Sequence, residues 1–469
     1  MAADAPGLKR SALIVSTLAS FTTPFMGSSV NIALPDIERT FALNAVALGW
    51  VASSYLLAAA MFLLPFGRLA DIHGRKRVFT IGLAVHSAAS LLAALAPSGA
   101  SFLAARAVQG VGGGMIFGTG MAILVSVYPP AERGRVLGIN VAAVYTGLSL
   151  GPFVGGFLTH ALGWRSLFIV VAALGLGVMA VTAFALKGEW AGARGERFDT
   201  RGAVAYSLSL TAVMLGFSLL PGIAGAVLLA AGVLGLAGFA LLEARTEHPL
   251  LDVGLFRYNR VFAFSSLAAL INYSATSAVT FLMSLYLQYI KGLPPTAAGT
   301  VLIAQPVTMA LFSPLAGRLS DRVEPRIVAS VGMAIIVVGL GLLVALGPDT
   351  SIPRIVVDLL LLGLGFALFS SPNTNAVMSA VQPRMYSVAS AALGTMRLTG
   401  QMLSMGIVIL IFATHIGKVR LTPEAYPAFL SGAHTAFVTF AVLSTAGVFF
   451  SLVRGRARPA PEASPGTSG

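Results

Sequence analysis

The chain of 469 residues has no cysteine and few charged residues, and both absences narrow its class. Without cysteine, disulfide, thiol and iron–sulfur chemistry give no information on its function or its compartment. Charged residues make up 10% of the chain, whereas soluble domains carry about 25%. Hydrophobic residues make up 57%, and the mean hydropathy is +0.87. A soluble protein has no place for so much apolar surface, so the composition predicts an integral membrane protein.

Acidic residues are scarce as well. The chain has 17 of them against 30 lysines and arginines, and its formal net charge is +13. In a soluble protein this excess would suggest nucleic acid as a partner. Here the cations lie in segments between apolar runs, which indicates an orientation in a lipid bilayer and no nucleic-acid partner.

Motifs of catalysis and nucleotide binding are missing too. The sequence has no Gly-x-Ser-x-Gly, no His-Glu-x-x-His and no phosphate-binding loop, and its six histidines are scattered. We therefore expect that the protein is not an enzyme, that it holds no metal or cofactor, and that it is not an ATP-driven pump.

Long apolar runs dominate the sequence instead. A spanning helix needs roughly 20 mostly apolar residues. Fourteen such runs follow one another, from Ser11–Ala33 to Ala433–Val453. If the N-terminus is cytoplasmic, 22 of the 30 basic residues lie inside or at inner helix ends, and six lie outside. This imbalance predicts a multi-pass protein with both termini in the cytoplasm.

One pentapeptide pattern occurs twice. Gly67-Arg68-Leu69-Ala70-Asp71 follows the second run, and Gly317-Arg318-Leu319-Ser320-Asp321 follows the tenth. Two six-helix halves with a two-helix insert between them place this element after spans two and ten, and internal repeats are a recurrent sign of secondary transporters. The predicted units are an N-terminal six-helix bundle, an insert with its connectors, a C-terminal six-helix bundle and a disordered cytoplasmic tail, at residues 1–187, 188–260, 261–453 and 454–469.

Three further segments carry functional patterns. In the first, Gly67 and Gly74 permit a tight turn and close helix approach, and the cations that follow would contact the anionic inner leaflet. In the second, an arginine inside the fourth run is costly unless it faces protein or water, where it can bind an anionic group. In the third, glycines four residues apart permit close helix packing, and a proline can kink the helix. The residues are Arg75, Lys76 and Arg77 in the first, Arg106 in the second, and Gly147, Gly151, Pro152 and Gly155 in the third.

Taken together, these residues resemble the major facilitator superfamily, in its 14-span drug:proton antiporter branch. The resemblance covers nearly the whole chain and implies an all-α membrane fold of two six-helix bundles plus a two-helix insert. In the family, the aspartate that matches Asp71 holds the two halves together through a helix N-terminus, here near Ser387–Ser390. The resemblance also implies proton transfer near Arg106 and an exporter motif in the fifth span. The gating residues that it implies are Gly67, Asp71, Gly74, Arg75, Lys76 and Asp321.

One position departs from the branch. Many of its drug exporters have an aspartate five residues before the asparagine that matches Asn31, whereas this chain has Met26. That aspartate is a usual candidate for proton or cation binding, and methionine is apolar and does not titrate. With Arg106 and Arg397 as intramembrane cations, our hypothesis is that substrates are neutral or anionic amphiphiles.

Other intramembrane acids are few. Asp358 is the best candidate for proton coupling, although Arg354 one turn earlier favours a helix-surface ion pair instead. Asp36 and Glu38 are expected to be solvated charges at the outer mouth. A substrate cavity is expected near the midplane between the halves. The candidates for it are Met26, Asn31, Asn272, Tyr273, Gln305, Arg397 and Gln401. The two asparagines, Tyr273 and Gln305 are also candidates for helix-packing hydrogen bonds.

The sequence thus predicts a secondary-active transporter in a bacterial cell membrane. We expect proton-coupled efflux of a hydrophobic or amphiphilic small molecule, by alternating access, from a protein that functions as a monomer. Export of a specific organic anion or metabolite is the alternative, and a non-transporting solute sensor is a remote one. A channel would favour symmetric pore-lining rings from several subunits, which a single chain with two related halves does not need.

Overall fold

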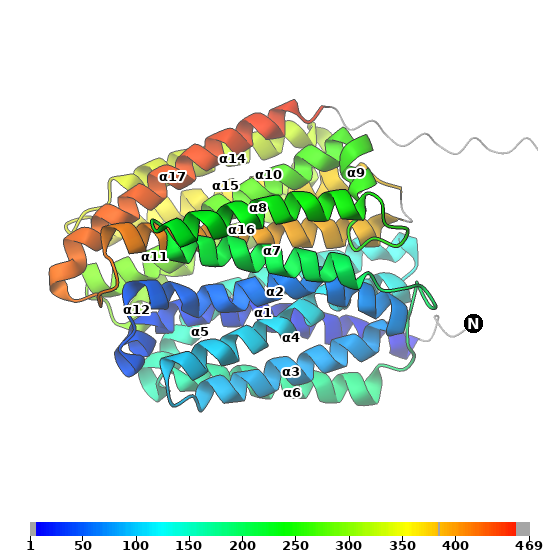
Figure 1. The fold of residues 1–469 in the computed structure, drawn as a ribbon, viewed down its shortest axis with the longest axis horizontal. Helices are drawn as coiled ribbons and strands as arrows, with labels where there is room; N and C mark the ends of the chain where they lie inside the picture. The colour runs from blue at the N-terminus through cyan, green and yellow to red at the C-terminus, as the bar shows by residue number, and fades with distance from the viewer. Residues whose placement is uncertain (1–5, 383–384, 456–469) are drawn as a thin grey trace, which may run out of the picture.

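The computed structural model describes residues 6–382 and 385–455, and the described residues form helices and no strand. Fourteen helical segments within these ranges are long and apolar enough to cross a membrane, which confirms the predicted number of spans. Helices suit this environment because they satisfy their backbone hydrogen bonds within each span. α1 begins and α17 ends at one end of the bundle, on the right in Figure 1, which we call the terminal end. The other end is called the opposite end.

The first half of the bundle consists of six helices that run alternately between the two ends. Its first helix is longer than the predicted apolar run and includes both Pro24 and Pro35. In the packing of this half, α1 lies along α5, α2 along α4, and α3 along both α4 and α6. The six helices are α1 (Pro6–Phe41), α2 (Ala45–His73), α3 (Arg75–Ala94), α4 (Gly99–Val127), α5 (Pro130–Leu162) and α6 (Arg165–Ala185).

Two helices form an insert between the halves, α7 (Thr200–Leu219) and α8 (Ile223–Glu243), and the short α9 (Val253–Tyr258) follows them. α7 packs against α8, against α2 of the first half and against α16 of the second (Figure 1). Only 17% of the apolar window of α8 is buried, so most of its surface is left to face lipid. The insert therefore contacts both halves through α7.

The second half also has six spans, two of which are interrupted. α10 ends and α11 begins around Ala278, whose N–H donates to Ser404 Oγ of α16 at 3.0 Å. A break frees backbone groups inside the membrane, and Ser404 satisfies one of them. The elements are α10 (Arg260–Thr276), α11 (Val279–Leu285), the π-helical turn η1 (Tyr286–Ile290), α12 (Pro295–Leu302), α13 (Ala304–Arg322), α14 (Pro325–Val344), α15 (Ile352–Ser379), α16 (Tyr386–His415), the 3₁₀ turn η3 (Pro423–Ala425) and α17 (Tyr426–Val453).

The two halves meet along two seams. On one side α2 runs along α16, and on the other α5 runs along α12 and α13. These seams bring together helices that are far apart in the sequence, so any site between them draws on both halves.

Candidate functional site: the boundary between the two halves

The segment from Gly67 to Arg77, which we call the signature segment, lies at the terminal end, and most of it is helical. α2 continues to His73, and the turn into α3 is made by Gly74, whose φ of 120° favours glycine. Gly67 lies inside α2 with open space beside its Cα, so it does not serve the turn as we expected. Asp71 accepts a hydrogen bond at 2.8 Å from Arg75 Nε, on the other side of this turn.

Two of the three cations that follow Gly74 form hydrogen bonds with other parts of the protein. Arg75 Nη1 donates to Ser126 Oγ at the end of α4, at 2.5 Å, and Lys76 Nζ donates to the carbonyl of Leu186, also at 2.5 Å. Arg77, in contrast, is exposed. The expectation that all three face the leaflet is therefore corrected for Arg75 and Lys76.

The connector after α6 packs against the signature segment through two glutamates. The carboxylate of Glu189 accepts the backbone N–H groups of Lys76, at 2.8 Å, and Arg77, at 3.0 Å, and so caps the N-terminus of α3. Glu196 forms an ion pair with Arg68. Sequence reasoning missed both glutamates because they lie 113 and 128 residues from these partners, and neither has a motif of its own.

The expected contact between Asp71 and the start of the thirteenth span is not recorded among the described residues. The backbone carbonyl of Asp71 accepts a hydrogen bond from Ala193 N–H at 2.9 Å. Near the start of α16, Ser390 Oγ lies 3.0 Å from Met121 Sδ of α4. The side chains outside the described residues include those of Ser387 and Asp321, both named in the prediction.

The glycines of the fifth span are divided between two interfaces. A Cβ at Gly147, Gly151 or Gly155 would overlap atoms of α1, so these three permit close packing inside the first half. Gly156, one residue further, lies against the main chain of Pro295 on α12. The carbonyl of Pro152 lies in the same way against Gly299 of α12. The spacing of four therefore builds the first half, while neighbouring positions contact the second half.

Arg106 sits in a buried polar network of the first half. It is 2% exposed, and its Nε donates to the carbonyl of Val51 at 3.1 Å. Its Nη1 donates to Gln109 Oε1, and its guanidinium carbon lies 4.8 Å from the ring centroid of Tyr55. Gln109 Nε2 in turn donates to Ser90 Oγ at 2.7 Å. No carboxylate contacts Arg106 among the described residues, so its positive charge is balanced by dipoles and an aromatic face.

Asp358 lies near the opposite end of α15. It is 2% exposed, and its Oδ2 is buried without a hydrogen-bond partner. No ion pair with Arg354 is recorded in the part of the chain that the structure describes, and Arg354 is exposed. The helix-surface pair that competed with a proton-coupling role is therefore not formed in this conformation.

A cluster of aromatic and polar side chains joins the halves midway along the bundle, and we call it the central cluster. The guanidinium carbon of Arg397 lies 5.1 Å from the ring centroid of Tyr273, and Tyr273 meets Phe366 edge-on at 5.4 Å. Tyr145 of the first half donates to Ser370 Oγ of the second half at 3.4 Å. Arg397 and Tyr273 were predicted for the cavity. Tyr145, Phe366 and Ser370 were not, because a lone aromatic or serine in a span carries no motif.

The other predicted cavity residues are spread over the bundle. Met26 is 1% exposed and belongs to the hydrophobic core. Asn272 is fully buried, and its amide oxygen and nitrogen both lack a hydrogen-bond partner. The half-buried members are Asn31, Gln305 and Gln401.

The halves are fastened to each other at the opposite end. Glu38 at the end of α1 has a side chain that is 5% exposed, and its Oε1 accepts a hydrogen bond from Arg420 Nε at 2.8 Å. Its Oε2 accepts from Tyr289 Oη at 3.3 Å. Both donors belong to the second half, and the hydrogen bond to the Glu38 carboxylate raises the pKa of Arg420. The expectation that Glu38 is a solvated charge is therefore wrong, whereas Asp36 pairs within α1 with Arg39.

Backbone contacts strengthen this closure. Ala45 N–H at the start of α2 donates to the carbonyl of Val419 at 2.9 Å. Ser284 Oγ donates to the carbonyl of Asn31 at 2.5 Å, and Gln288 Nε2 donates to that of Ile32 at 3.0 Å. Most of the described hydrogen bonds between the halves thus lie at the opposite end. The exceptions are Tyr145–Ser370 midway and Ser390–Met121 at the terminal end.

We expect Glu38→Gln to loosen this closure, because the amide keeps the size of the side chain but loses the ion pair with Arg420. The natural chain has no cysteine, so Asn31→Cys provides a single reporter thiol behind the closure. A membrane-impermeant maleimide added from the opposite side should label this thiol severalfold faster in the Glu38→Gln variant. Asp36→Asn is the matched control and should leave the rate unchanged. Equal rates for Glu38→Gln and the parent would contradict the closure.

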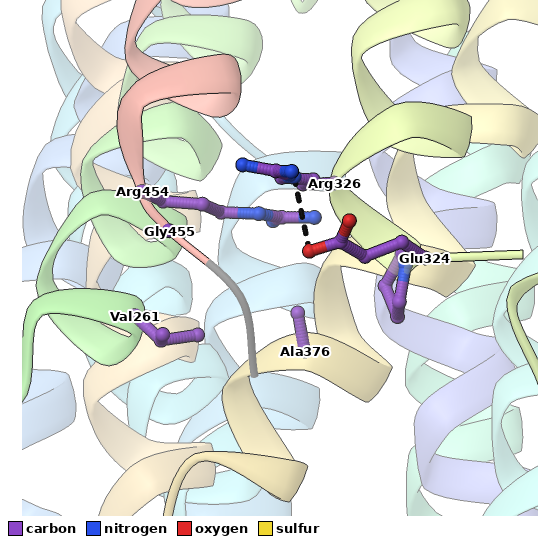
Figure 2. Close-up of a pocket in the computed structure, with 7 residues that line it drawn as sticks. Val261, Glu324, Arg326, Ala376, Arg454 and Gly455 are labelled. Atoms are coloured by element: carbon purple, nitrogen blue, oxygen red, sulfur yellow. Dashed lines mark ion pairs between the residues drawn. The ribbon is translucent and has the colours of Figure 1, made fainter. Parts of the chain in front are cut away.

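Arg454 lies at the terminal end of the second half, beside Glu324 and Arg326 (Figure 2). It is 1% exposed, and its Nη1 donates to Ser265 Oγ of α10 at 3.1 Å and to Asn373 Oδ1 of α15 at 3.0 Å. Burial lowers the pKa of Arg454 to about 10, and the nearby Glu324 opposes that effect. The predicted tail therefore begins too early, because residue 454 belongs to the core. Residues 456–469 lie outside the described residues.

The sequence of this chain matches one family model in two segments. The family model for the Major Facilitator Superfamily matches residues 16–197 and 265–469 of this chain. The unmatched interval between the two segments holds the insert and α9.

Three curated relatives match along most of their length. The cephamycin export protein CmcT of Amycolatopsis lactamdurans is 33% identical, over 87% of this chain and 85% of its own. The multidrug resistance protein Stp of Mycobacterium tuberculosis is 31% identical, over 84% of this chain and 74% of its own. The riboflavin transporter RibZ of Clostridioides difficile is 29% identical, over 82% of this chain and 84% of its own.

Solved structures show the same fold. A bacterial homologue of the human lysosomal transporter Spinster aligns with a TM-score of 0.71 at 17% identity, over 97% of this chain and 100% of that chain. The human organic anion transporter MFSD10 aligns with a TM-score of 0.67 at 16% identity, over 96% of this chain and 100% of that chain. At these identities the likeness concerns the fold.

Proposed function

The chain belongs to the major facilitator superfamily and is a multi-pass membrane transporter, and we propose that it exports hydrophobic or amphiphilic small molecules in exchange for protons. Two relatives, a multidrug resistance protein and a cephamycin export protein, support export of small molecules. The central cluster supports this substrate class as well. It combines aromatic faces with the cation of Arg397 at the boundary between the halves.

The proposed orientation places the terminal end in the cytoplasm. Those of the 22 inner basic residues that lie within residues 6–382 and 385–455 are at that end of the fold, and the positive-inside rule assigns this end to the cytoplasm. On this assignment both termini are cytoplasmic, and the conformation is closed toward the outside. The relatives named above come from bacteria, which supports a bacterial cell membrane as the location. A single chain holds both halves, so we propose that it works as a monomer.

The observation that carries the proposed mechanism is the one-sided closure. The contacts of Glu38 with Arg420 and Tyr289 join the halves at the outer end, and the midway Tyr145–Ser370 contact lies beneath them. In alternating access the halves rock about a central site and close at one end at a time. We propose that Asp71 contacts the start of α16 only when the cytoplasmic end closes. The proposed gate residues are Gly67, Asp71, Gly74, Arg75, Lys76 and Asp321.

Proton coupling is assigned to groups inside the spans. Asp358 is a buried carboxyl group, and one of its oxygens has no hydrogen-bond partner. It can therefore gain or lose a proton without breaking an ion pair. Arg106 is a buried cation without a carboxylate, which suits it to an anionic substrate group or to a carboxylate in another conformation. The glycines that face α1 and the Pro152–Gly299 contact supply the packing on which these movements depend.

A second candidate function is export of one specific metabolite or organic anion. Two observations favour it: a relative is named as a riboflavin transporter, and Met26 is a buried core residue where many drug exporters have an aspartate. With no acid at that position, cationic drugs lose their usual partner. The dyes in the following test separate the two functions.

We expect proteoliposomes with an imposed pH gradient to move a neutral or anionic amphiphilic dye against the proton flow, and to move a matched cationic dye much less. Asp358→Asn should abolish gradient-driven movement because the amide cannot exchange a proton. Asp349→Asn, an exposed acid nearby, is the control and should transport normally. Selective efflux of the cationic dye would overturn the substrate assignment. Full activity of Asp358→Asn would remove this residue from coupling.

A further inference from the structure

Two carboxyl groups meet at the terminal end of the insert, outside both halves. Asp199 precedes α7, and its Oδ1 accepts the N–H of Gly202 at 2.9 Å, so it caps that helix. Glu243 is the last residue of α8, and its Oε2 accepts the N–H of Leu251 at 2.9 Å. Each carboxyl group therefore uses one oxygen to satisfy a backbone donor.

The second oxygens of the two groups have no donor. Asp199 Oδ2 and Glu243 Oε1 are both buried and receive no hydrogen bond, and Glu243 is only 2% exposed. A Cβ built on Gly202 would overlap both of these oxygens, so they lie side by side over this glycine. Two bare carboxylate oxygens in this position would repel each other and lack the hydrogen bonds of water. One hydrogen placed between them turns one oxygen into a donor and leaves the other as its acceptor.

No described residue supplies a cation to this pair. Neither carboxyl group has an ion-pair partner in residues 6–382 and 385–455. Among the charged residues near the pair in the sequence, Arg201, Arg245 and Glu247 are exposed, His248 lies beside Glu196, and Asp252 caps α9 through Gly254 N–H. Within the described residues, the positive charge that the site needs is therefore left to come from solution.

We propose that Asp199 and Glu243 form a binding site for one proton, which is shared between Oδ2 and Oε1 and ties the start of α7 to the end of α8. When the proton is bound, the pair carries one negative charge and one O–H···O hydrogen bond. When the proton leaves to water at the terminal end, the pair carries two adjacent negative charges, and the two helix ends separate.

The location connects this site with both halves. On α7, Ser218 Oγ accepts a hydrogen bond from Trp50 Nε1 of α2 at 3.0 Å, and the ring of Phe217 lies against Gly406 of α16. The connector that ends at Asp199 carries Glu196, which binds Arg68 of the signature segment. A change in the packing of α7 on α8 therefore reaches the seam where α2 and α16 meet.

The pH dependence of stability tests the site independently of transport. The folded protein binds one more proton at this pair than the unfolded chain does, so its stability falls as the pH rises through the loss of that proton. In purified full-length protein we expect the melting temperature to fall by about 2–4 °C between mildly acidic and mildly alkaline pH, because the loss begins above the pKa of a carboxyl group in the unfolded chain. Glu243→Gln replaces the shared hydrogen with a permanent amide donor, so this fall should disappear. Glu247→Gln, an exposed acid in the same connector, should keep it.

Two outcomes would overturn the proposal. The first is the same pH profile in the wild type and in Glu243→Gln. The second is a wild-type loss at the higher pH that sodium reverses and choline at equal ionic strength does not, because that result identifies a metal-cation site instead. If Glu243→Gln does not fold, the proposal is tested by measuring the infrared band of protonated carboxyl groups against pH. The wild type and Asp199→Asn are compared. A titrating component of this band that is present in the wild type and lost in Asp199→Asn supports the shared proton, and an unchanged band refutes it.

Discussion

Gly156→Leu is expected to abolish export while the protein still folds. Gly156 lies on α5 against the main chain of Pro295 and Thr296 on α12, where a Cβ has no room. Backbone atoms cannot move aside as a flexible side chain does, and overpacking costs about 1–3 kcal/mol. We expect this overlap only while the opposite end is closed, because alternating access as proposed above would move α5 away from α12. The larger side chain should therefore disfavour the closed state by roughly tenfold to a hundredfold.

Efflux in whole cells or proteoliposomes measures this loss, and labelling of the Asn31→Cys reporter from the opposite side should rise in parallel. The matched control is Gly138→Leu on the same helix, since no atom lies within 4 Å of the position of its Cβ. It should export normally. If Gly156→Leu exports at the wild-type rate, then α5 and α12 do not form the closing surface that we assign to them.

Arg106→Gln is expected to lower export by at least about tenfold, because the proposed coupling uses its charge. It should not lower the melting temperature, because a buried cation without a carboxylate destabilises the fold by several kcal/mol. Glutamine removes the charge and still offers an amide donor to the carbonyl of Val51. A residue that served packing alone would show the opposite result, with lower stability and nearly normal transport. Thermal unfolding and efflux on the same preparation separate the two cases.

Arg454→Gln is the comparison for this experiment. Arg454 is also a buried arginine, but it joins Ser265 of α10 to Asn373 of α15 and lies near Glu324 (Figure 2). Its loss leaves these polar groups without a donor, so the melting temperature should fall. If Arg106→Gln lowers the melting temperature as much as Arg454→Gln does, Arg106 has a structural role in the first half and its coupling role is not supported.

Several site residues were invisible in the sequence for one reason: their partners are distant along the chain. Glu38 reads as an exposed acid after an apolar run, yet its two partners lie 382 and 251 residues away. Glu189 reads as part of a polar connector, yet it caps α3. A pattern of hydrophobicity reports on the local helix, and it contains no information on which distant donor will arrive beside a carboxylate.

Some motif residues have roles that spacing alone did not separate. Gly67 and Gly74 look equivalent in the sequence, but only Gly74 has a positive φ and makes the turn. Gly155 and Gly156 are adjacent, and on a helix they point in different directions, so one faces α1 and the other faces α12. Only the packed helices show which face meets which neighbour.

The scarcity of charge and the length of the apolar runs determined the class of this protein, the number of spans and its predicted orientation. These properties are local, because each span must hide its own backbone from lipid whatever its neighbours are. The tertiary structure decided which end is closed, which cations are paired and where two carboxyl groups meet without a donor. Those features depend on side chains brought together from different helices, so the burial and contacts of Glu38, Asp358 and Glu243 appear only once the bundle is assembled.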